Sequence, residues 1–453
     1  MPPLPIGERE GERSRNKKHF DCGYTPSLPL PRKREREQRT PPTHQILIPL
    51  ESHTNFVYAK RHTMKDLIMS SATDTLMPVT DSTTFSFDLE RSVLAKVLSH
   101  LQSIVEKKTT IPILSNVLLR LQNGQLSATA TDLELDVIEA VTVLSHESGS
   151  TTVPVHTLYD IVRKLPDQAM MHFLCEDTHI KLTSDRAKFS IPVLPASEYP
   201  TISQLAVKHT LGLNAIALKT LLQKTRFCMS TLETRYALNG VYCHTITGED
   251  GQKRIRMVAL DGHRLAMADA VIQDCPDFEP FIIPKKAVNE LCRLLEDQET
   301  PVTLSLSATK MAVAWDRLSL STKLIDDAFP DYKQILPKDN TLILSVNTTA
   351  LRQAVDRVAT MTSDKFNGIS FAIQGQHIVI NATSSAYREG TEEVSCTFTG
   401  DDMTINFNAR FLMDILSQIS GETTVLNIRD SMTPVMFRDA SSDSALFVMM
   451  PLR

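Results

Sequence analysis

The chain has 453 residues, of which 42% are hydrophobic and 22% are charged, and its formal net charge is −5. This length exceeds one ordinary core, because domains average roughly 100–200 residues, so we expect two to four domains. No apolar run approaches the ~18 residues that a membrane-spanning helix needs, so no membrane anchor is predicted. The seven cysteines are scattered, with no CxxC spacing, which favours free thiols in a reducing cytoplasm over disulfides or a cysteine zinc site.

The first 84 residues differ in composition from the rest. They contain proline-rich and mixed-charge stretches such as PSLPLPRKREREQRTPP and almost no periodic apolar pattern, so we interpret residues 1–84 as a disordered N-terminal extension. Its acidic residues disfavour an organellar transit peptide, and it lacks the apolar core of a secretory signal. Two alternatives stay open: the RKRER run could be a nucleic-acid tail instead of a solvated charge run, and Met64 or Met77 could be the true start.

From residue 85 onward the chain repeats itself. The segments FSFDLERSVLAKVL, LGLNAIALKTLL and LSVNTTALRQAV each combine alternating apolar residues with a following stretch of apolar residues at helical spacing. This pattern predicts a strand that leads into a helix with one buried face. The expected buried positions are Leu94, Val97, Leu98 and Leu101 in the first copy, Leu218, Leu221 and Leu222 in the second, and Leu351, Val355 and Val358 in the third.

Each copy has a second half of the same kind, in TVPVHTLYDIVRKL, IIPKKAVNELCRLL and NFNARFLMDILSQI, and alternating strand patterns follow every helix. Six half-units therefore predict three domains, over residues 85–206, 207–337 and 338–453. The expected fold class is α+β, with helices on one side of antiparallel sheets. A repeat with no obvious cap predicts a chain that closes on itself or pairs with another copy.

The stretch LDGHRLAMAD places Asp261, Gly262, His263 and Arg264 in a row, which are residue types that active sites use. Alignment of the three copies sets Asp261 at the same corner as Asp132 and Ser384, as expected for a turn residue between apolar strands. Only the middle copy carries Gly-His-Arg there, which is typical of a special surface on one copy of a scaffold. A hydrolase that uses Asp261 and His263 is the rival interpretation.

Other catalytic and metal-binding patterns are missing from the sequence. There is no G-x-S-x-G, no G-x-x-x-x-G-K-[ST] and no H-E-x-x-H, and the 13 histidines form no ligand-spaced cluster. The stretch TDLELD, residues 131–136, puts three acids on one strand face; these could hold a metal, but an exposed strand face is the preferred interpretation. We therefore expect no catalysis, no metal and no cofactor.

Several basic residues recur on the faces that point away from the core. Arg163 and Arg293 occupy the same position in two second-half helices, roughly 140° from the first apolar anchor. Lys285 and Lys286 open the middle one of these helices, and Lys108 lies in an earlier loop. Together they could contact phosphates without reading sequence. An ordinary mixed-charge helix surface is the alternative.

Seven motifs in series, TIPILSNVLL, ATDLEL, RYALNGV, ALDGHRLA, FPDYKQILPK, DKFNGI and the ending FVMMPLR, resemble the bacterial DNA polymerase III beta subunit family, the sliding clamps. The resemblance runs from about Phe85 to Arg453. It implies three DNA-clamp domains that form a head-to-tail homodimeric ring, with helices inside and antiparallel sheets outside. It also implies a processivity factor that encircles double-stranded DNA, tethers the replicative polymerase and has no enzymatic activity. An ordinary, non-topological DNA-binding module is the remaining alternative.

The same resemblance assigns residues to two surfaces. The implied DNA contacts are Lys108, Arg163, Tyr236, Lys285, Lys286 and Arg293; Ala237 stands where relatives often carry a second aromatic residue. Between the second and third domains lies an apolar pocket for short Leu- and Phe-containing peptides of the polymerase III alpha subunit, the clamp loader and other partners. The implied pocket residues are Leu238, Leu260, Gly262, His263, Arg264, Leu265, Pro330, Gln334, Ile335, Val448, Met450, Pro451, Leu452 and Arg453. Because Leu260 replaces a usual threonine and Gln334 a usual arginine, we expect an altered peptide preference.

Overall fold

The computed structural model describes residues 84–453 except 108, 146, 202–204, 233, 273–274, 363–366 and 384–388. Residues 1–83 of the predicted extension, the predicted DNA contact Lys108 and the corner residue Ser384 therefore lie outside the described residues. Within the described part of the chain, no helix is long and apolar enough to cross a membrane.

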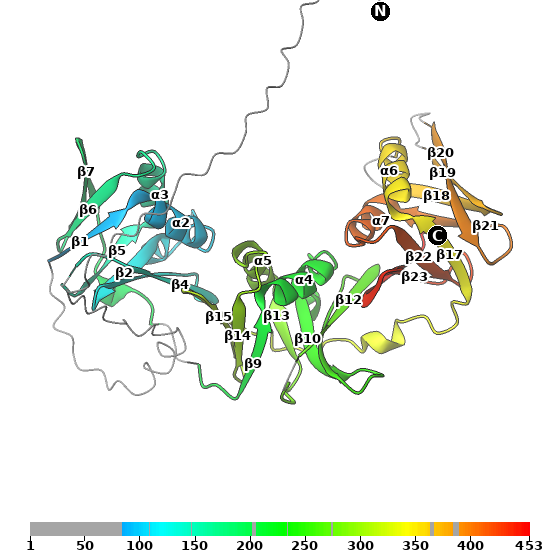
Figure 1. The fold of residues 1–453 in the computed structure, drawn as a ribbon, viewed down its shortest axis with the longest axis horizontal. Coiled ribbons are helices and arrows are strands. Elements are labelled where there is room, and N and C mark those ends of the chain that lie inside the picture. Colours follow the sequence, from blue (N-terminus) through cyan, green and yellow to red (C-terminus); the bar gives the residue numbers. More distant parts are fainter. Residues whose placement is uncertain are drawn as a thin grey trace, which may run out of the picture. The chain divides into compact units, whose positions relative to one another are not determined.

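The described residues form three α+β domains, each built from two half-units of the type strand, helix and three strands (Figure 1). The first domain contains β1 (Phe85–Glu90), α2 (Arg91–Leu101), β2 (Asn116–Gln122), β3 (Gln125–Thr131) and β4 (Leu135–Thr142), then β5 (Gly149–Pro154), α3 (Val155–Val162), β6 (Met170–Cys175), β7 (His179–Ser184) and β8 (Ala187–Pro192). Short 3-10 helices, η1 (Pro112–Ser115) and η2 (Ala196–Glu198), lie in its loops.

The other two domains repeat this order. The middle domain contains β9 (His209–Asn214), α4 (Ala215–Arg226), η3 (Tyr236–Leu238), β10 (Gly240–Thr247), β11 (Lys253–Leu260) and β12 (Arg264–Val271), then β13 (Phe281–Pro284), α5 (Lys285–Leu294), β14 (Pro301–Leu306), β15 (Lys310–Trp315) and β16 (Leu318–Lys323). After η4 (Tyr332–Gln334), the last domain contains β17 (Leu342–Asn347), α6 (Thr348–Ala359), β18 (Gly368–Gln374), β19 (His377–Thr383) and β20 (Glu389–Phe398), then β21 (Met403–Asn408), α7 (Ala409–Leu416), β22 (Thr423–Ile428), β23 (Val435–Asp439) and β24 (Ser442–Met449).

The leading strand of each half-unit joins the sheet of the other half-unit. In the first domain β1 pairs with β6 and β5 with β2, and the same exchange pairs β9 with β14, β13 with β10, β17 with β22 and β21 with β18. Each domain therefore has two four-stranded antiparallel sheets tied by their leading strands. The two helices of each domain pack together on one side of the strands (Figure 1). This arrangement confirms the predicted α+β repeat.

Sheets continue across both junctions between neighbouring domains. At the first junction β4 pairs with β16, and at the second β12 pairs with β24, both antiparallel. In the last domain β17 also pairs with β20, so the result is a four-stranded sheet, β1-β6-β7-β8, an eight-stranded sheet and a twelve-stranded sheet. Main-chain hydrogen bonds therefore hold the three domains side by side, in addition to side-chain contacts.

The helices form where apolar residues recur on one face, and three of them begin with a side-chain cap. Asn214, Asn347 and Asn408 cap α4, α6 and α7, each accepting the backbone N–H three residues later. The expected buried positions of α2, α4 and α6 lie in the core, as do the apolar positions at the same spacing in the second half-units, except that Ile161 and Leu165 in the first domain are only partly buried. The apolar period alone thus located the α-helix of every half-unit in the described part of the chain.

Candidate functional site

Two corners of the fold use the same aspartate turn. The Oδ1 atom of Asp132 accepts the N–H groups of Glu134 and Leu135 at 2.9 and 2.7 Å, and the Oδ1 atom of Asp261 accepts those of His263 and Arg264 at 2.9 and 3.0 Å. The residue after each aspartate is left-handed, Leu133 with φ 77° and Gly262 with φ 95°. The predicted equivalence of Asp132 and Asp261 as turn residues is therefore confirmed; the third member, Ser384, is not described.

Arg264 ties the middle domain to the last. Its guanidinium donates to the Oδ2 atom of Asp261 at 3.0 Å, to the Oδ2 atom of Asp414 in α7 at 2.6 Å and to the carbonyl of Phe227 at 2.8 Å. It also lies over the rings of Phe411 and Phe227, at 4.3 and 5.2 Å from their centroids. Because only 9% of this side chain is exposed, its charge serves the junction and is not offered to a ligand at the rim.

His263 and Asp261 do not form the dyad that a hydrolase would need. The Asp261 carboxylate accepts the backbone N–H of His263, while the imidazole lies 5.9 Å from the ring of Phe411, centroid to centroid. The acids of the TDLELD stretch likewise have separate partners: Asp132 pairs with Lys286, Glu134 with Lys323, and Asp136 with hydroxyls. No group of His, Cys, Asp and Glu among the described residues could hold a metal ion.

The apolar members of the predicted partner pocket come together. Leu238, Leu260, Leu265 and Val448 pack in one cluster at the β12–β24 edge, each no more than 7% exposed. Three residues of this cluster were not predicted: Val258, Tyr332 and Met436. The alternation Val258–Leu260 along β11, and the position of Tyr332 between two predicted residues in FPDYKQ, were the available signals; the contribution of Met436 from β23 depends on tertiary pairing.

The remaining predicted pocket residues surround this cluster. The Met450 N–H donates to the carbonyl of His263 at 2.9 Å, and the Leu452 N–H donates to the carbonyl of Asn406 at 2.8 Å, so the chain end is fixed against the second junction. Ile335 and Met450 are 39% and 44% exposed, which leaves apolar surface beside the buried cluster. Pro330, Gln334, Gly262 and Arg453 are exposed, and Pro451 and Leu452 are half-buried.

Polar and aromatic contacts join this cluster and the adjacent loop to strand β10. Nε2 of His244 lies 3.0 Å from the hydroxyl of Tyr332, and the ring of Tyr242 stacks on Phe329 with centroids 4.6 Å apart. Burial lowers the pKa of His244, so the neutral imidazole is favoured in the folded protein. The loop that carries Pro330, Gln334 and Ile335 is thereby anchored to β10.

Two of the predicted DNA contacts of the middle domain, Lys286 and Arg293, bond to the first domain. Nζ of Lys286 pairs with Asp132 of the first domain, and Arg293 donates to the carbonyls of Ser99 and His100 and to the hydroxyl of Ser103. These two cations therefore link the domains. Lys285 begins α5 beside them and is half-buried.

The other predicted DNA contacts are spread over the first and middle domains. Arg163 follows α3 directly and pairs with Asp160 at 2.8 Å, with 53% of its side chain exposed. Tyr236 opens η3 and is 55% exposed, which leaves its ring available for stacking. The neighbouring Ala237 is buried against Ile282 and Ile325 and does not continue the aromatic surface.

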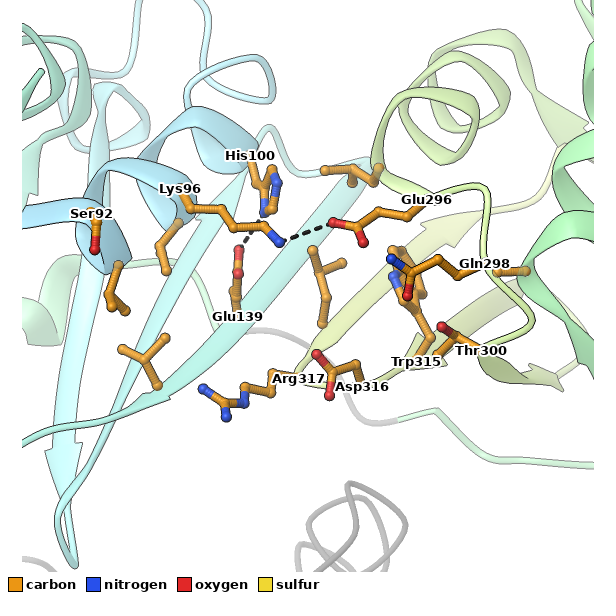
Figure 2. Close-up of a pocket in the computed structure, with 16 residues that line it drawn as sticks. Ser92, Lys96, His100, Glu139, Glu296, Gln298, Thr300, Trp315, Asp316 and Arg317 are labelled. Atoms are coloured by element: carbon orange, nitrogen blue, oxygen red, sulfur yellow. Dashed lines mark hydrogen bonds and ion pairs between the residues drawn. The ribbon is translucent and has the colours of Figure 1, made fainter. Parts of the chain in front are cut away.

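A cavity of about 600 Å³ lies at the first junction, between α2, β4 and the β15–β16 turn. Figure 2 shows Lys96 reaching across it to Glu296, with Nζ and Oε1 2.9 Å apart, and His100 paired with Glu139 at 2.8 Å. Its wall includes Trp315. The cavity was not anticipated, because its residues come from both domains and share no sequence motif.

Three repeated α+β domains, joined by continuous sheets and bearing paired helices on one side, define the architecture of a sliding clamp. The comparisons agree with this class over the whole described region. Family models match residues 85–203 as the N-terminal domain, 212–331 as the central domain and 333–453 as the C-terminal domain of the DNA polymerase III beta subunit. The chain belongs to the DNA polymerase III beta subunit family.

Individual relatives agree. The beta sliding clamp of Caulobacter vibrioides is 38% identical over 368 residues, which cover 81% of this chain and 99% of that protein; that of Escherichia coli K12 is 33% identical over the same length, with the same coverage. A crystal structure of the Caulobacter crescentus beta sliding clamp superposes with a TM-score of 0.78 at 37% identity, covering 82% of this chain and all of that one. A Pseudomonas aeruginosa sliding clamp bound to griselimycin gives a TM-score of 0.77 at 31% identity, covering 81% of this chain and 99% of that one.

Proposed function

We propose that this chain is the processivity factor of a replicative DNA polymerase and works as a closed ring of two copies joined head to tail. The ring encircles duplex DNA, slides along it and holds the polymerase through a short peptide. Each copy contributes three domains, over residues 85–206, 207–337 and 338–453, and the ranges of the family models support this division. The protein acts in the cytoplasm, where its free cysteines stay reduced.

The observation that carries this proposal is the continuity of the sheets across both junctions. β4 pairs with β16 and β12 with β24. At the two ends of the repeat, the corresponding strand β8 is an edge strand, and β20 pairs beyond β19 only through Cys396, Thr397 and Phe398, with β17 of its own domain, so most of its outer edge has no partner among the described residues. An open edge is a template for another strand. A second copy satisfies both edges when its first domain follows the last domain of this one, and a heterologous contact of this kind closes into a ring.

DNA binding in such a ring is weak and independent of sequence. Lys285 and the exposed Tyr236 supply a phosphate contact and a stacking surface, and Lys108 adds a charge from outside the described residues. The described domains are acidic in total, but screening beyond ~8 Å means that only charges close to the phosphates matter. Contacts to phosphates position the duplex without fixing the ring at one base sequence.

Partner binding uses the apolar cluster of Leu238, Leu260, Leu265 and Val448 together with the exposed Ile335 and Met450. A short peptide with leucine and phenylalanine side chains suits this surface, because adaptable methionine and aliphatic walls take such groups without strict geometry. The polymerase III alpha subunit, the clamp loader and other carriers of such a peptide are the expected partners. No bond is broken at this site, since Asp261 and His263 are turn and junction residues.

Retention on DNA of different topology tests the ring. After loading, the protein should stay on nicked circular DNA and slide off linear DNA of the same length, because a closed ring is held only by topology. Equal retention on both would support the alternative of an ordinary DNA-binding module. A strict monomer by sedimentation, at half the mass expected of a dimer, would rule out the two-copy ring.

A further inference from the structure

An arginine from the middle domain caps the first helix of the first domain. Arg293 donates to the carbonyls of Ser99 and His100, at 3.3 and 2.6 Å, and to the hydroxyl of Ser103 at 2.5 Å. Glu290 holds this arginine at 2.8 Å and also accepts the Ser103 hydroxyl at 2.9 Å. The carbonyls at the C-terminal end of a helix lack intrahelical partners and carry negative partial charge, so a guanidinium fits them well.

The first domain carries the same pair on the corresponding helix. Arg163 follows α3 at the position that Arg293 holds in α5, and Asp160 stands where α5 has Glu290. Both arginines form the same ion pair three residues back, Arg163 with Asp160 and Arg293 with Glu290, each at 2.8 Å. Among the described residues no domain precedes the first one, so Arg163 has no helix end of a preceding domain to cap.

The last domain carries the matching acceptor end. Thr360 follows α6 at the position that Ser103 has after α2, and its hydroxyl donates to the carbonyl of Arg357 as the Ser103 hydroxyl donates to that of His100. The similarity extends to the adjacent strand, since Arg357 pairs with Glu392 of β20 as His100 pairs with Glu139 of β4. The end of α6 therefore presents the carbonyls and hydroxyl that the end of α2 presents to Arg293.

The second junction uses a related contact, in which the guanidinium belongs to the same domain as the helix and only the acid comes from the following domain. There Arg264 donates to the carbonyl of Phe227, the residue equivalent to Ser103, and pairs with Asp414, the residue equivalent to Glu290 and Asp160. Both junctions thus place a guanidinium, held by an acid of the following domain, at the end of the preceding first helix.

We propose that Arg163, held by Asp160, caps the end of α6 in a second copy of this chain at Thr360 and the carbonyl of Arg357. This inference rests on the proposed head-to-tail ring and deepens it by naming a contact between the subunits. It also gives Arg163 a role at the subunit boundary in place of the predicted contact with DNA.

A double-mutant cycle on the full chain tests the contact. Arg163→Ala should raise the dimer dissociation constant, measured by sedimentation over a dilution series, by at least tenfold, because each ring contains the contact twice and hydrogen bonds to a charged group are strong. Thr360→Val should raise it less. If the two side chains meet, the double variant should be close to Arg163→Ala alone.

Arg120→Ala is the matched control, since it removes an exposed arginine of the same domain that lies on β2, away from α3. The inference is overturned if Arg163→Ala leaves dimerisation unchanged, or if it lowers DNA affinity and flattens its salt dependence without changing dimerisation. Independent additive effects of Arg163 and Thr360 would also overturn it. Failure of the proposed function is distinct, because the unaltered protein would then be a monomer or be retained equally on linear and circular DNA.

Discussion

At the first junction the side chains that meet where β3, β4 and β16 run side by side are Thr131, Asp136 and Ser321. The same three register positions at the second junction hold Leu260, Leu265 and Val448. The polar set satisfies itself: the Thr131 hydroxyl donates to Asp136 at 2.5 Å and the Ser321 hydroxyl at 3.2 Å. The apolar set belongs to the cluster at the chain end.

The two junctions therefore share the same strand pairing and differ in the side chains that line it. Strands pair through main-chain hydrogen bonds, which do not depend on the side chains that point out of the sheet. A polar junction and an apolar junction can therefore have the same geometry. The three apolar side chains are themselves only 5, 1 and 2% exposed, so they form the base of the proposed docking site beside the exposed Ile335 and Met450. Burial of those exposed side chains by a partner lowers the free energy at about 25 cal/mol per Å².

The largest effect is expected from moving the polar residues into the second junction. Leu265→Asp alone should lower the free energy of unfolding by about 3–5 kcal/mol, because it buries a charge without a partner. The triple change of Leu260→Thr, Leu265→Asp and Val448→Ser should recover part of that loss, since two hydroxyls then donate to the new carboxylate. Both variants should lose binding of a Leu/Phe-containing peptide; urea unfolding and peptide titration measure the two effects.

The reverse exchange at the first junction, Thr131→Leu with Asp136→Leu and Ser321→Val, is the control. It should leave peptide affinity unchanged, because the second junction is intact. Normal peptide binding by the polar triple variant would show that the cluster is not the docking surface.

A smaller effect on the free energy of unfolding is expected from the cations at the two junctions, Arg264 and Lys286. Arg264→Ala leaves Asp261 and Asp414 without their shared partner and should cost about 3 kcal/mol of unfolding free energy. Arg264→Lys should recover only part, because an ammonium cannot fill three acceptors and stack on Phe411 as a planar guanidinium does. Lys286→Ala at the first junction should cost about 1 kcal/mol or less, since the lysine is 39% exposed. Denaturant unfolding measures all three, and equal losses for Arg264→Ala and Lys286→Ala would contradict this ranking.

The smallest effect concerns pH. His244 has Arg120 as its counterpart in the first domain, so only the second junction holds a histidine at this position, bonded to Tyr332. Because burial lowers the pKa of His244 in the folded state, the unfolded chain binds the proton more readily. Its stabilising contribution is full above the unfolded pKa, about 6.5, and is lost as the pH falls below it. Lowering the pH from 7.5 to 5.5 should therefore reduce the free energy of unfolding less in His244→Gln than in the unaltered protein. The difference should be up to about 1 kcal/mol, measured by thermal unfolding at the two pH values. An identical pH response in the two proteins would refute the assignment.

The fold was largely predictable because its signals are local. Apolar residues at helical spacing around Leu94, Leu218 and Leu351 located the first helix of each domain, and alternating residues located the strands that follow. The Asp132 and Asp261 turns were predictable for the same reason, since a short carboxylate bonds to the backbone two and three residues on. The exchange of leading strands between half-units was not, because which strands pair is a long-range choice.

The site was predictable in part. Leu238, Leu260, Leu265 and Val448 were named on family motifs, and the structure brings them together with Val258 and Met436, which no motif marks. Arg264 and Arg293 were predictable as basic residues near a surface. Their actual partners, the carbonyl of Phe227 and the end of α2, come from distant elements and could not be inferred from neighbouring letters.

By itself the sequence determined the number of domains, the α+β class, the helical faces and the turns, because each depends on residues within about a dozen positions of one another. Tertiary structure alone decided that β4 pairs with β16 and β12 with β24, that one junction is polar and the other apolar, and that Arg293 caps α2 across a domain boundary. Those outcomes depend on which distant residues meet, and burial and register, not local preference, fix that.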